Sequence, residues 1–160
     1  METEPDAETK NWHVYCIGTH TSPNVINMKN FSFTPAPVKI KKKILIVDDE
    51  ISVLKLLEFI LKEDYNPIIK KSGFEALSAL NNGEIPDLII SDMEMPYFNG
   101  AEFIKSLKTS GYFRNIPVIV LSGSDTLENI KAKIPYQING FMSKPFNPTY
   151  LKETIGTLLN

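Results

Sequence analysis

The chain has 160 residues, with 17 basic and 19 acidic side chains and a formal net charge of −2. Its hydrophobic fraction of 42% is typical of one globular domain, which excludes the collagen-like and disulfide-rich classes. The slightly acidic balance offers no basic surface for a phosphate backbone, so we expect no direct nucleic-acid binding.

The sequence carries no signal for secretion or for membrane insertion. No apolar run approaches the ~18 residues that span a bilayer, and the first residues are acidic where a secretory signal is basic. Cys16 is the single cysteine and cannot form an internal disulfide. We therefore expect a cytoplasmic protein with no membrane partner.

Residues 1–43 differ in composition from the rest of the chain. They contain four prolines and many Thr, Ser and Asn residues, and only His13 to Ile17 alternates in the manner of a strand. We predict that residues 1–43 are a mostly disordered or loosely structured N-terminal extension and that residues 44–160 form the folded domain.

From Ile44 onward, five short apolar runs alternate with helical patterns. Uninterrupted aliphatic strands are typical of a parallel sheet that helices cover on both faces. The alternation predicts the α/β class: a flavodoxin-like, doubly wound sheet of five parallel strands, (βα)5, in the order 2-1-3-4-5. The five runs are residues 44–47, 67–69, 88–90, 118–121 and 140–142.

The segments between the runs contain signals for the ends of helices. Three of them place a capping residue three positions before a glutamate, and Asn147 precedes a proline at a first helical position. Asn82-Gly83 and Ser110-Gly111 predict helix ends. The three capping pairs are Ser72 with Glu75, Asn99 with Glu102, and Asp125 with Glu128.

Polar residues follow four of the five predicted strands. Asp48 and Asp49 follow the first, Asp92 the third, Ser122 the fourth and Lys144 the fifth. Ligands of such sheets bind beyond the carboxyl ends of the strands, so we expect these side chains to converge. Three carboxylates beside one lysine leave a charge of about −2, which a divalent cation would neutralise. Because no His or Cys is nearby, the oxygen ligands favour Mg²⁺, and the set suits phosphoryl transfer.

Each of these residues also has a plain structural explanation. An aspartate at a strand end often caps a helix, and a serine there is often a turn residue. The coincidence of all five at one edge favours a functional site.

Four motifs resemble the receiver domain of bacterial two-component response regulators. They are ILIVDDE at 44–50, LIISDMEMPYFNG at 88–100, VLSG at 120–123 and FMSKPF at 141–146. The resemblance covers residues 44 to about 160. The spacings of 30 residues from Asp92 to Ser122 and of 52 from Asp92 to Lys144 fit the receiver pattern.

The resemblance implies a role for each site residue. Asp92 would be the phosphoacceptor, taking a phosphoryl group from the phosphohistidine of a kinase. Asp49 would bind Mg²⁺ directly and Asp48 through water, while Asp92 and the backbone carbonyl of Glu94 would complete the protein ligands. Lys144 would pair with the phosphoryl oxygens, and its bond to Pro145 is usually cis in the family.

The resemblance also implies a conformational switch. Ser122 would donate its hydroxyl to the phosphoryl group, and the ring of Phe141 would turn inward into the space that Ser122 leaves. Phe141 has an alternative explanation as an ordinary core residue. The segment Ile134 to Gly140 departs from the family pattern and predicts a short fourth helix, and the effect of Glu94 on phosphate lifetime stays open.

A partner surface is expected because no output domain is recognisable in the sequence. We predict that Val53, Leu56, Leu57 and Ile60 form the core stripe of the first helix. Ile51 and Leu54 would then be exposed. Together with Pro145 they would form a face for a histidine kinase or phosphotransfer protein, and the signal would pass to an unidentified downstream protein.

Two rival functions remain open. Asp92-Met-Glu94 also resembles the start of haloacid-dehalogenase-like phosphatases, with Asp92 as nucleophile, but those enzymes place the paired acids last in the chain. The second rival function is that of a receiver that acts without phosphorylation, purely as an interaction module. We expect a stand-alone signalling domain and not a turnover enzyme.

Overall fold

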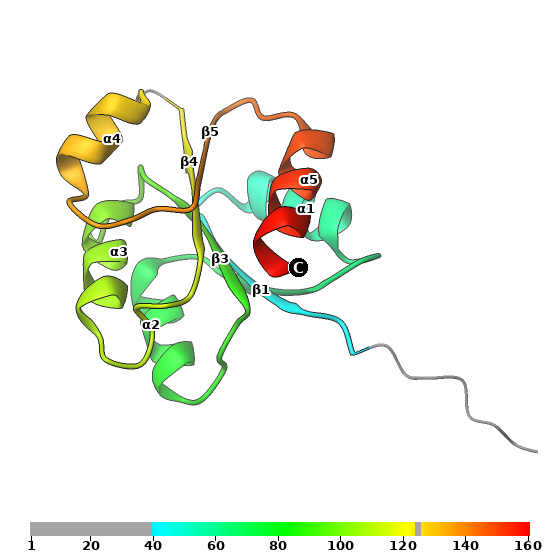
Figure 1. Ribbon diagram of the computed structural model, residues 1–160, viewed down its shortest axis with the longest axis horizontal. Coiled ribbons are helices and arrows are strands. Elements are labelled where there is room, and N and C mark those ends of the chain that lie inside the picture. Colours follow the sequence, from blue (N-terminus) through cyan, green and yellow to red (C-terminus); the bar gives the residue numbers. More distant parts are fainter. Residues whose placement is uncertain (1–39, 124–125) are drawn as a thin grey trace, which may run out of the picture. The chain divides into compact units, whose positions relative to one another are not determined.

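The computed structural model describes residues 40–123 and 126–160 of the chain (Figure 1). The predictions for residues 1–39, which include the strand-like run at His13 to Ile17 and the thiol of Cys16, lie outside the described residues. The family motifs all lie within them.

The five predicted strands form one parallel sheet in the order β2-β1-β3-β4-β5, which confirms the predicted topology. Each strand is four or five residues long, and β1, β3 and β4 are mostly aliphatic and buried, as strands covered on both faces require. The strands are β1 (Lys43–Val47), β2 (Asn66–Lys70), β3 (Leu88–Asp92), β4 (Val118–Ser122) and β5 (Gly140–Ser143).

A helix follows each strand, and the capping residues define where most of these helices begin. The Ser72 hydroxyl accepts a hydrogen bond from the Glu75 amide, Asn99 and Glu102 form a reciprocal capping box, and Asn147 caps before Pro148. The helices are α1 (Ile51–Leu61), α2 (Gly73–Asn81), α3 (Gly100–Thr109), α4 (Leu127–Lys133) and α5 (Pro148–Leu159).

The fourth helix corrects one prediction and confirms another. Thr126, and not Asp125, is its N-cap, because the Thr126 side chain accepts a hydrogen bond from the Asn129 amide. With seven residues α4 is the shortest helix among the described residues, as the sequence of residues 134–140 predicts. None of the helices in the described part of the chain is long and apolar enough to cross a bilayer.

Alternate residues of the strands point to opposite faces of the sheet and build two separate cores. One core packs against α2, α3 and α4, and the other packs against α1 and α5, which gives three layers (Figure 1). Strand residues of the first core are Leu45, Val47, Ile89, Val118 and Val120; those of the second are Ile44, Ile46, Leu88, Ile90, Ile119 and Leu121.

The buried stripe of α1 differs from the predicted one. Leu54, Leu57 and Leu61 are buried, whereas Leu56 is 48% exposed. Leu57 is buried as predicted, and Val53 and Ile60 pack partly buried against the same core. The prediction was wrong for Leu56 and missed Leu54, because eight of the eleven residues of α1 are apolar and periodicity alone allows more than one stripe. Packing against α5 and the sheet selects the stripe that contains Leu54.

Candidate functional site

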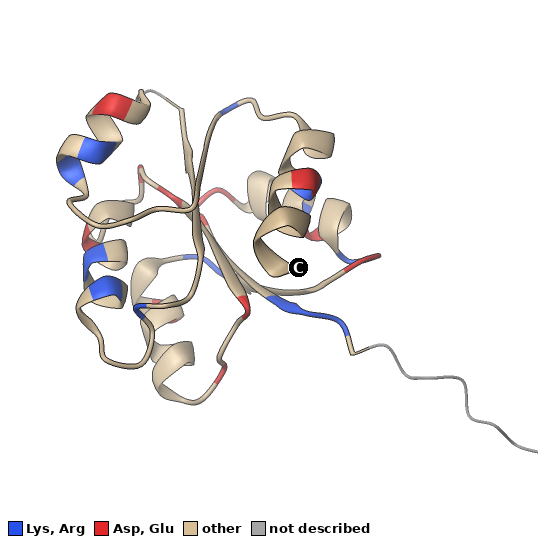
Figure 2. Cartoon of the chain, viewed as in Figure 1, with Lys and Arg blue, Asp and Glu red and all other residues tan. Residues whose placement is uncertain are grey.

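The carboxyl ends of four neighbouring strands carry the predicted site residues. Asp48 follows β1 directly, Asp92 ends β3, Ser122 ends β4, and Lys144 follows β5. Figure 2 shows acidic positions where β1 and β3 end, side by side in the sheet. The parallel register places the ends of these strands at one edge, although 96 residues separate Asp48 from Lys144.

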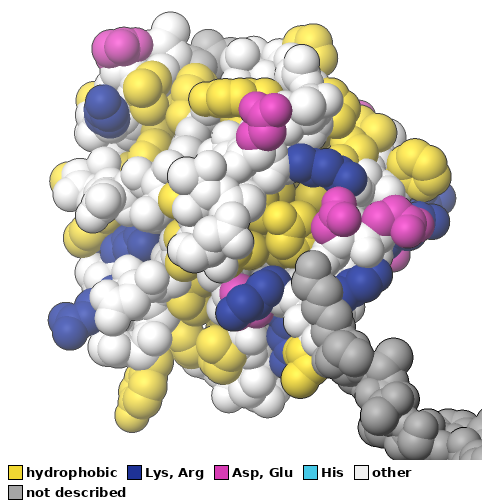
Figure 3. All heavy atoms as spheres, turned by 45° about the vertical axis from the view of Figure 1, so that its right-hand side comes forward, with side chains coloured by type: hydrophobic (Ala, Val, Ile, Leu, Met, Phe, Trp, Pro, Cys, Tyr) yellow, Lys and Arg dark blue, Asp and Glu magenta, His cyan; other side chains and the backbone are white. Residues whose placement is uncertain are grey.

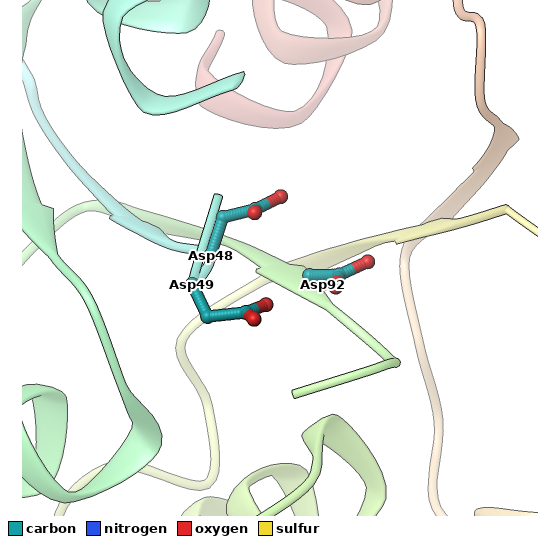
Figure 4. A group of neighbouring side chains, drawn as sticks. All are labelled: Asp48, Asp49 and Asp92. Carbon is teal, nitrogen blue, oxygen red and sulfur yellow. The ribbon is translucent and has the colours of Figure 1, made fainter. Parts of the chain in front are cut away.

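Three carboxylates meet at this edge. Oxygens of Asp48, Asp49 and Asp92 all lie within 4.8 Å of one another, and Figure 4 shows the three side chains pointing the same way. Asp48 is 1% and Asp92 3% exposed, whereas Asp49 is exposed. The cluster therefore has a buried base and an open mouth.

Lys144 supplies the positive charge at the base of the cluster. Its Nζ donates a hydrogen bond of 2.8 Å to Oδ2 of Asp48 and lies 2.9 Å from Oδ1 of Asp92. The other oxygen of Asp48 accepts a hydrogen bond from the backbone amide of Glu50 at 2.8 Å. Asp92 Oδ1 is buried and pairs with the Lys144 ammonium.

Burial and charge shift the protonation equilibria of the two central groups. Burial raises the pKa of Asp92, and the neighbouring charge of Asp48 adds to this effect, while Lys144 opposes it. Burial by itself would lower the pKa of Lys144, but the hydrogen bonds and charges of Asp48 and Asp92 outweigh it and raise that pKa. Lys144 thus stays protonated, and burial disfavours the ionised form of Asp92.

The donor set fits a hard divalent cation. Three carboxylates and one ammonium sum to a charge of −2, and only oxygen ligands are present. Lys144 offsets only part of the negative charge of the cluster, so a further positive group is favourable beside the three carboxylates. Asp92 is at the same time a carboxylate, a group that can act as a nucleophile.

Ser122 and Phe141 lie in the neighbouring strands. Ser122 is fully buried, and its backbone carbonyl accepts a hydrogen bond of 2.7 Å from the Lys144 amide. Phe141 is half-buried and packs against the core that faces α2, α3 and α4. The sheet thus couples the ends of β4 and β5 through the backbone.

Glu94 and Gly123 lie opposite each other at the mouth. Glu94 is exposed, and its Oε2 lies 3.5 Å from the position that a Cβ on Gly123 would occupy. The side chain of Glu94 therefore reaches from the β3–α3 loop to the end of β4. The peptide bond between Lys144 and Pro145 is cis, as the resemblance implies.

Sequence reasoning missed the role of Gly100 at this site. A Cβ on Gly100 would lie 2.1 Å from the backbone oxygen of Asp92, so α3 begins in direct contact with the end of β3. The loop between them contains Tyr97 at φ 65°, which lies between the hydrogen-bonded Pro96 carbonyl and Phe98 amide. The only signal in the sequence was a glycine after the capping Asn99.

Two of the three residues predicted for the partner face are exposed. Ile51 is 51% exposed at the start of α1, and Pro145 is exposed directly after Lys144. Leu54 is 2% exposed and packs in the core with α5, so its prediction as a docking residue was wrong.

The comparisons with known proteins agree with this geometry. The family model of the response regulator receiver domain matches residues 44–156. The probable transcriptional regulator ycf29 of Pyropia yezoensis is 35% identical over 121 residues, which cover 73% of this chain and 53% of that protein. The chemotaxis protein CheY1 of Helicobacter pylori is 26% identical over 119 residues, covering 73% of this chain and 96% of that protein.

A solved structure of a response regulator is also similar to this chain. The chemotaxis response regulator CheY4 of Vibrio cholerae aligns with a TM-score of 0.66 and 31% identity over 74% of this chain and 99% of that chain. This chain spans about half the length of the Pyropia relative and nearly the whole length of the two chemotaxis proteins. The chain belongs to the response regulator receiver domain family, the signalling domains of two-component systems.

Proposed function

We propose that Asp92 accepts a phosphoryl group from the phosphohistidine of a kinase or phosphotransfer protein, in a reaction that requires Mg²⁺. One observation carries the proposal: Lys144 joins the buried carboxylates of Asp48 and Asp92 beside Asp49 at one sheet edge. Family membership supports the same assignment.

The chemistry assigned to each side chain follows from this arrangement. An oxygen of Asp92 attacks the phosphorus, a new O–P bond forms, and the P–N bond to the donor imidazole breaks with its electron pair left on nitrogen. Lys144 lies within 2.9 Å of the attacking carboxylate, and its ammonium offsets the negative charge of the arriving phosphoryl oxygens. The other ring nitrogen of the phosphohistidine carries a proton in this step, so the donor imidazole leaves as the neutral base.

The metal ligands are proposed from the carboxylate cluster. Asp49, Asp92 and the backbone carbonyl of Glu94 would bind Mg²⁺ directly, with Asp48 acting through water. The bound cation would neutralise charge on the phosphoryl oxygens. Asp48 also has a structural role, because its two oxygens accept hydrogen bonds from Lys144 and from the amide of Glu50 at the base of the site.

The response to phosphorylation is proposed to run through the end of β4. The hydroxyl of Ser122 would bind the phosphoryl group, and Phe141, half-buried in the next strand, would change its packing. The changed surface would select a downstream protein in the cytoplasm, with no direct contact to nucleic acid or membrane. Ile51 and Pro145 are the exposed residues that we assign to kinase or phosphotransfer docking.

The experiment is intact-mass measurement after incubation with acetyl phosphate, with and without Mg²⁺. We expect a gain of one phosphoryl group, labile to base, only when Mg²⁺ is present. Asp92→Asn should abolish the gain, and Asp87→Asn, at the opposite end of β3, is the matched control that should keep it. A phosphoryl group that persists in Asp92→Asn would assign the modification to another residue and end the proposal. Repeated turnover of a small phosphate ester would instead identify a phosphatase.

A further inference from the structure

The loop between β3 and α3, residues 93–99, is anchored at its base by main-chain hydrogen bonds. The Met93 amide donates to a backbone carbonyl of β4 at 3.0 Å, and the Gly100 amide donates to the Met93 carbonyl at 3.1 Å. Met95 is 5% exposed and lies in the core that faces α2, α3 and α4. Glu94, whose carbonyl we assign to Mg²⁺, therefore lies between two buried methionines.

The outer part of this loop contains a strained turn. The Phe98 amide donates a hydrogen bond of 2.7 Å to the Pro96 carbonyl, which closes a three-residue turn around Tyr97. Tyr97 has a φ of 65°, and such a turn with a positive φ is rare and strained for a residue other than glycine. The Tyr97 side chain is 99% exposed, so its own contacts do not offset the strain. Neighbouring residues must hold the turn in place.

Phe98 provides this attachment, because its ring packs on the start of α2. The rings of Phe98 and Phe74 stack with centroids 4.6 Å apart and an interplanar angle of 27°. A Cβ on Gly73 would overlap the Phe98 ring, so the ring lies directly against the backbone of the first residue of α2. Phe98 also packs against the core cluster that contains Met95. The outer part of the loop is thus attached to α2, and not only to α3, which it precedes.

Phe74 is placed for contact with Phe98 and not for burial in the core. It is 61% exposed, although it is a large apolar side chain. Exposed apolar groups are common on proteins, and Figure 3 shows hydrophobic atoms interspersed with charged side chains over one face of this molecule. Exposure alone therefore indicates no function. Phe74 differs in that its ring stacks on the loop that follows Asp92.

We propose that Phe98 and Phe74 are positioning residues for the divalent cation and make its site selective for Mg²⁺. The inference rests on the proposed function and extends it to residues outside the carboxylate cluster. Five residues separate Asp92, held in β3, from Phe98, held on α2, so the backbone between them, including the Glu94 carbonyl, has few conformations available. Groups that orient a metal ligand typically change metal affinity about 10–100-fold.

The selectivity follows from how firmly the loop is held. Mg²⁺ requires nearly ideal octahedral coordination at about 2.0–2.1 Å, whereas Ca²⁺ accepts a more flexible arrangement at about 2.3–2.6 Å. A loop that is attached at both ends restricts the movement of the Glu94 carbonyl, which matters more for the smaller cation. When the stack is removed, we therefore expect the affinity for Mg²⁺ to fall more than the affinity for Ca²⁺.

NMR titration of the full chain with MgCl₂ and, separately, with CaCl₂ tests the proposal, because the amide signals report both cation binding and an intact fold. Phe98→Ala should raise the dissociation constant for Mg²⁺ about tenfold and that for Ca²⁺ less than about threefold. Phe74→Ala should act in the same direction, and its exposed position keeps this variant folded. Phe59→Ala removes a ring of α1 that is 68% exposed and should leave both constants unchanged.

Further variants separate stacking from general apolar packing. Phe74→Tyr retains the ring and should keep the wild-type affinity for Mg²⁺, whereas Phe74→Leu should resemble Phe74→Ala. The double variant with Phe74→Ala and Phe98→Ala should bind Mg²⁺ no more weakly than Phe98→Ala alone, because both substitutions remove the same contact.

The outcomes distinguish this inference from the proposed function. Wild-type protein that binds Mg²⁺, with Phe98→Ala and Phe74→Ala of unchanged affinity, would overturn the inference and leave the proposed metal site intact. Equal losses for Mg²⁺ and Ca²⁺ would also overturn it, because the stack would then have no part in selectivity. A wild-type chain that binds neither cation would contradict the proposed function, and the inference with it.

Discussion

Asp92 is 3% exposed, and oxygens of Asp48 and Asp49 lie within 4.8 Å of its carboxylate, while Lys144 is the cation beside it. A buried charge without full compensation raises the free energy of the folded state. The same lack of compensation leaves the carboxylate available to a cation and to an electrophile. Stability and reactivity are therefore opposed at this residue.

Asp92→Asn should stabilise the protein in the absence of divalent cations. The folded-state pKa of Asp92 is raised, mainly by burial, so its ionised form penalises folding above that pKa. The penalty should shrink as the pH falls through the folded-state pKa and be absent below about 3.9, the ordinary value. We expect a gain on the order of 1 kcal/mol at neutral pH from removing one like charge. Urea unfolding in EDTA at pH 7 and near pH 4 measures it, and a less stable variant at pH 7 would contradict it.

Lys144→Ala should separate metal binding from phosphoryl transfer. Removing the ammonium eliminates a cation within 3 Å of Asp48 and Asp92, so Mg²⁺ should bind at least as tightly as in the wild type. Uptake from acetyl phosphate should fall at least tenfold, because the charge on the phosphoryl oxygens is no longer offset. Isothermal titration with Mg²⁺ and intact mass provide the two readouts. Much weaker Mg²⁺ binding would show that Lys144 organises the carboxylates instead.

At the scale of elements, the junction between β3 and α3 fixes the position of Asp92. The Gly100 amide donates a hydrogen bond to the Met93 carbonyl, and the capping box of Asn99 and Glu102 starts α3 at Gly100. The first residue of α3 therefore lies against the backbone of Asp92. Only glycine leaves the space for this close approach.

Gly100→Ala should destabilise the fold, because its Cβ would lie 2.1 Å from the Asp92 carbonyl oxygen. We expect a loss of about 1–3 kcal/mol, the usual range for overpacking. Gly156→Ala in α5 is the control, since nothing lies within 4 Å of its added Cβ, and it should gain up to about 1 kcal/mol from helix propensity. Chemical denaturation compares them; equal stabilities would show that the junction relaxes at little cost.

The first helix provides a second test at this scale. Leu54→Ala should cost about 2–5 kcal/mol, because Leu54 is 2% exposed in the core shared with α5. Leu56→Ala, at 48% exposure, should remain within about 0.5 kcal/mol of the wild type. If chemical denaturation showed that Leu56→Ala loses more stability than Leu54→Ala, it would support the buried stripe predicted from periodicity instead.

At the scale of the whole molecule, the parallel sheet brings residues that are far apart in the sequence together in one site. Adjacent strands in the order β1-β3-β4-β5 deliver the acids, the hydroxyl and the amine to the same edge. The three layers hold that edge rigidly, because both faces of every strand are packed. This packing, together with the contacts of Lys144, keeps the mutually repelling carboxylates in place.

Divalent cations should therefore stabilise the whole fold. A cation that binds only the folded state adds about 2.7 kcal/mol at 100 times its dissociation constant. Thermal unfolding with Mg²⁺ and with EDTA should show this difference for the wild type, and a much smaller one for Asp49→Asn. A melting temperature independent of Mg²⁺ would argue against a metal site at the three carboxylates.

The local signals in the sequence were sufficient for the fold class and for most of the site. Five aliphatic runs, each followed by a helical pattern, determine a covered parallel sheet, and the polar residues after Val47, Ser91, Leu121 and Ser143 must then share one edge. These features depend on neighbours in the chain. For that reason the sequence predicted them without knowledge of any tertiary contact.

The tertiary structure decided what depends on partners far apart in the chain. It selected Leu54 over Leu56 for the core, since an almost wholly apolar helix takes its orientation from α5 and the sheet. It joined Lys144 to Asp48 and Asp92 and placed Gly100 against the Asp92 backbone. Contacts of this kind arise from packing and close approach in three dimensions, which residue type and spacing do not encode.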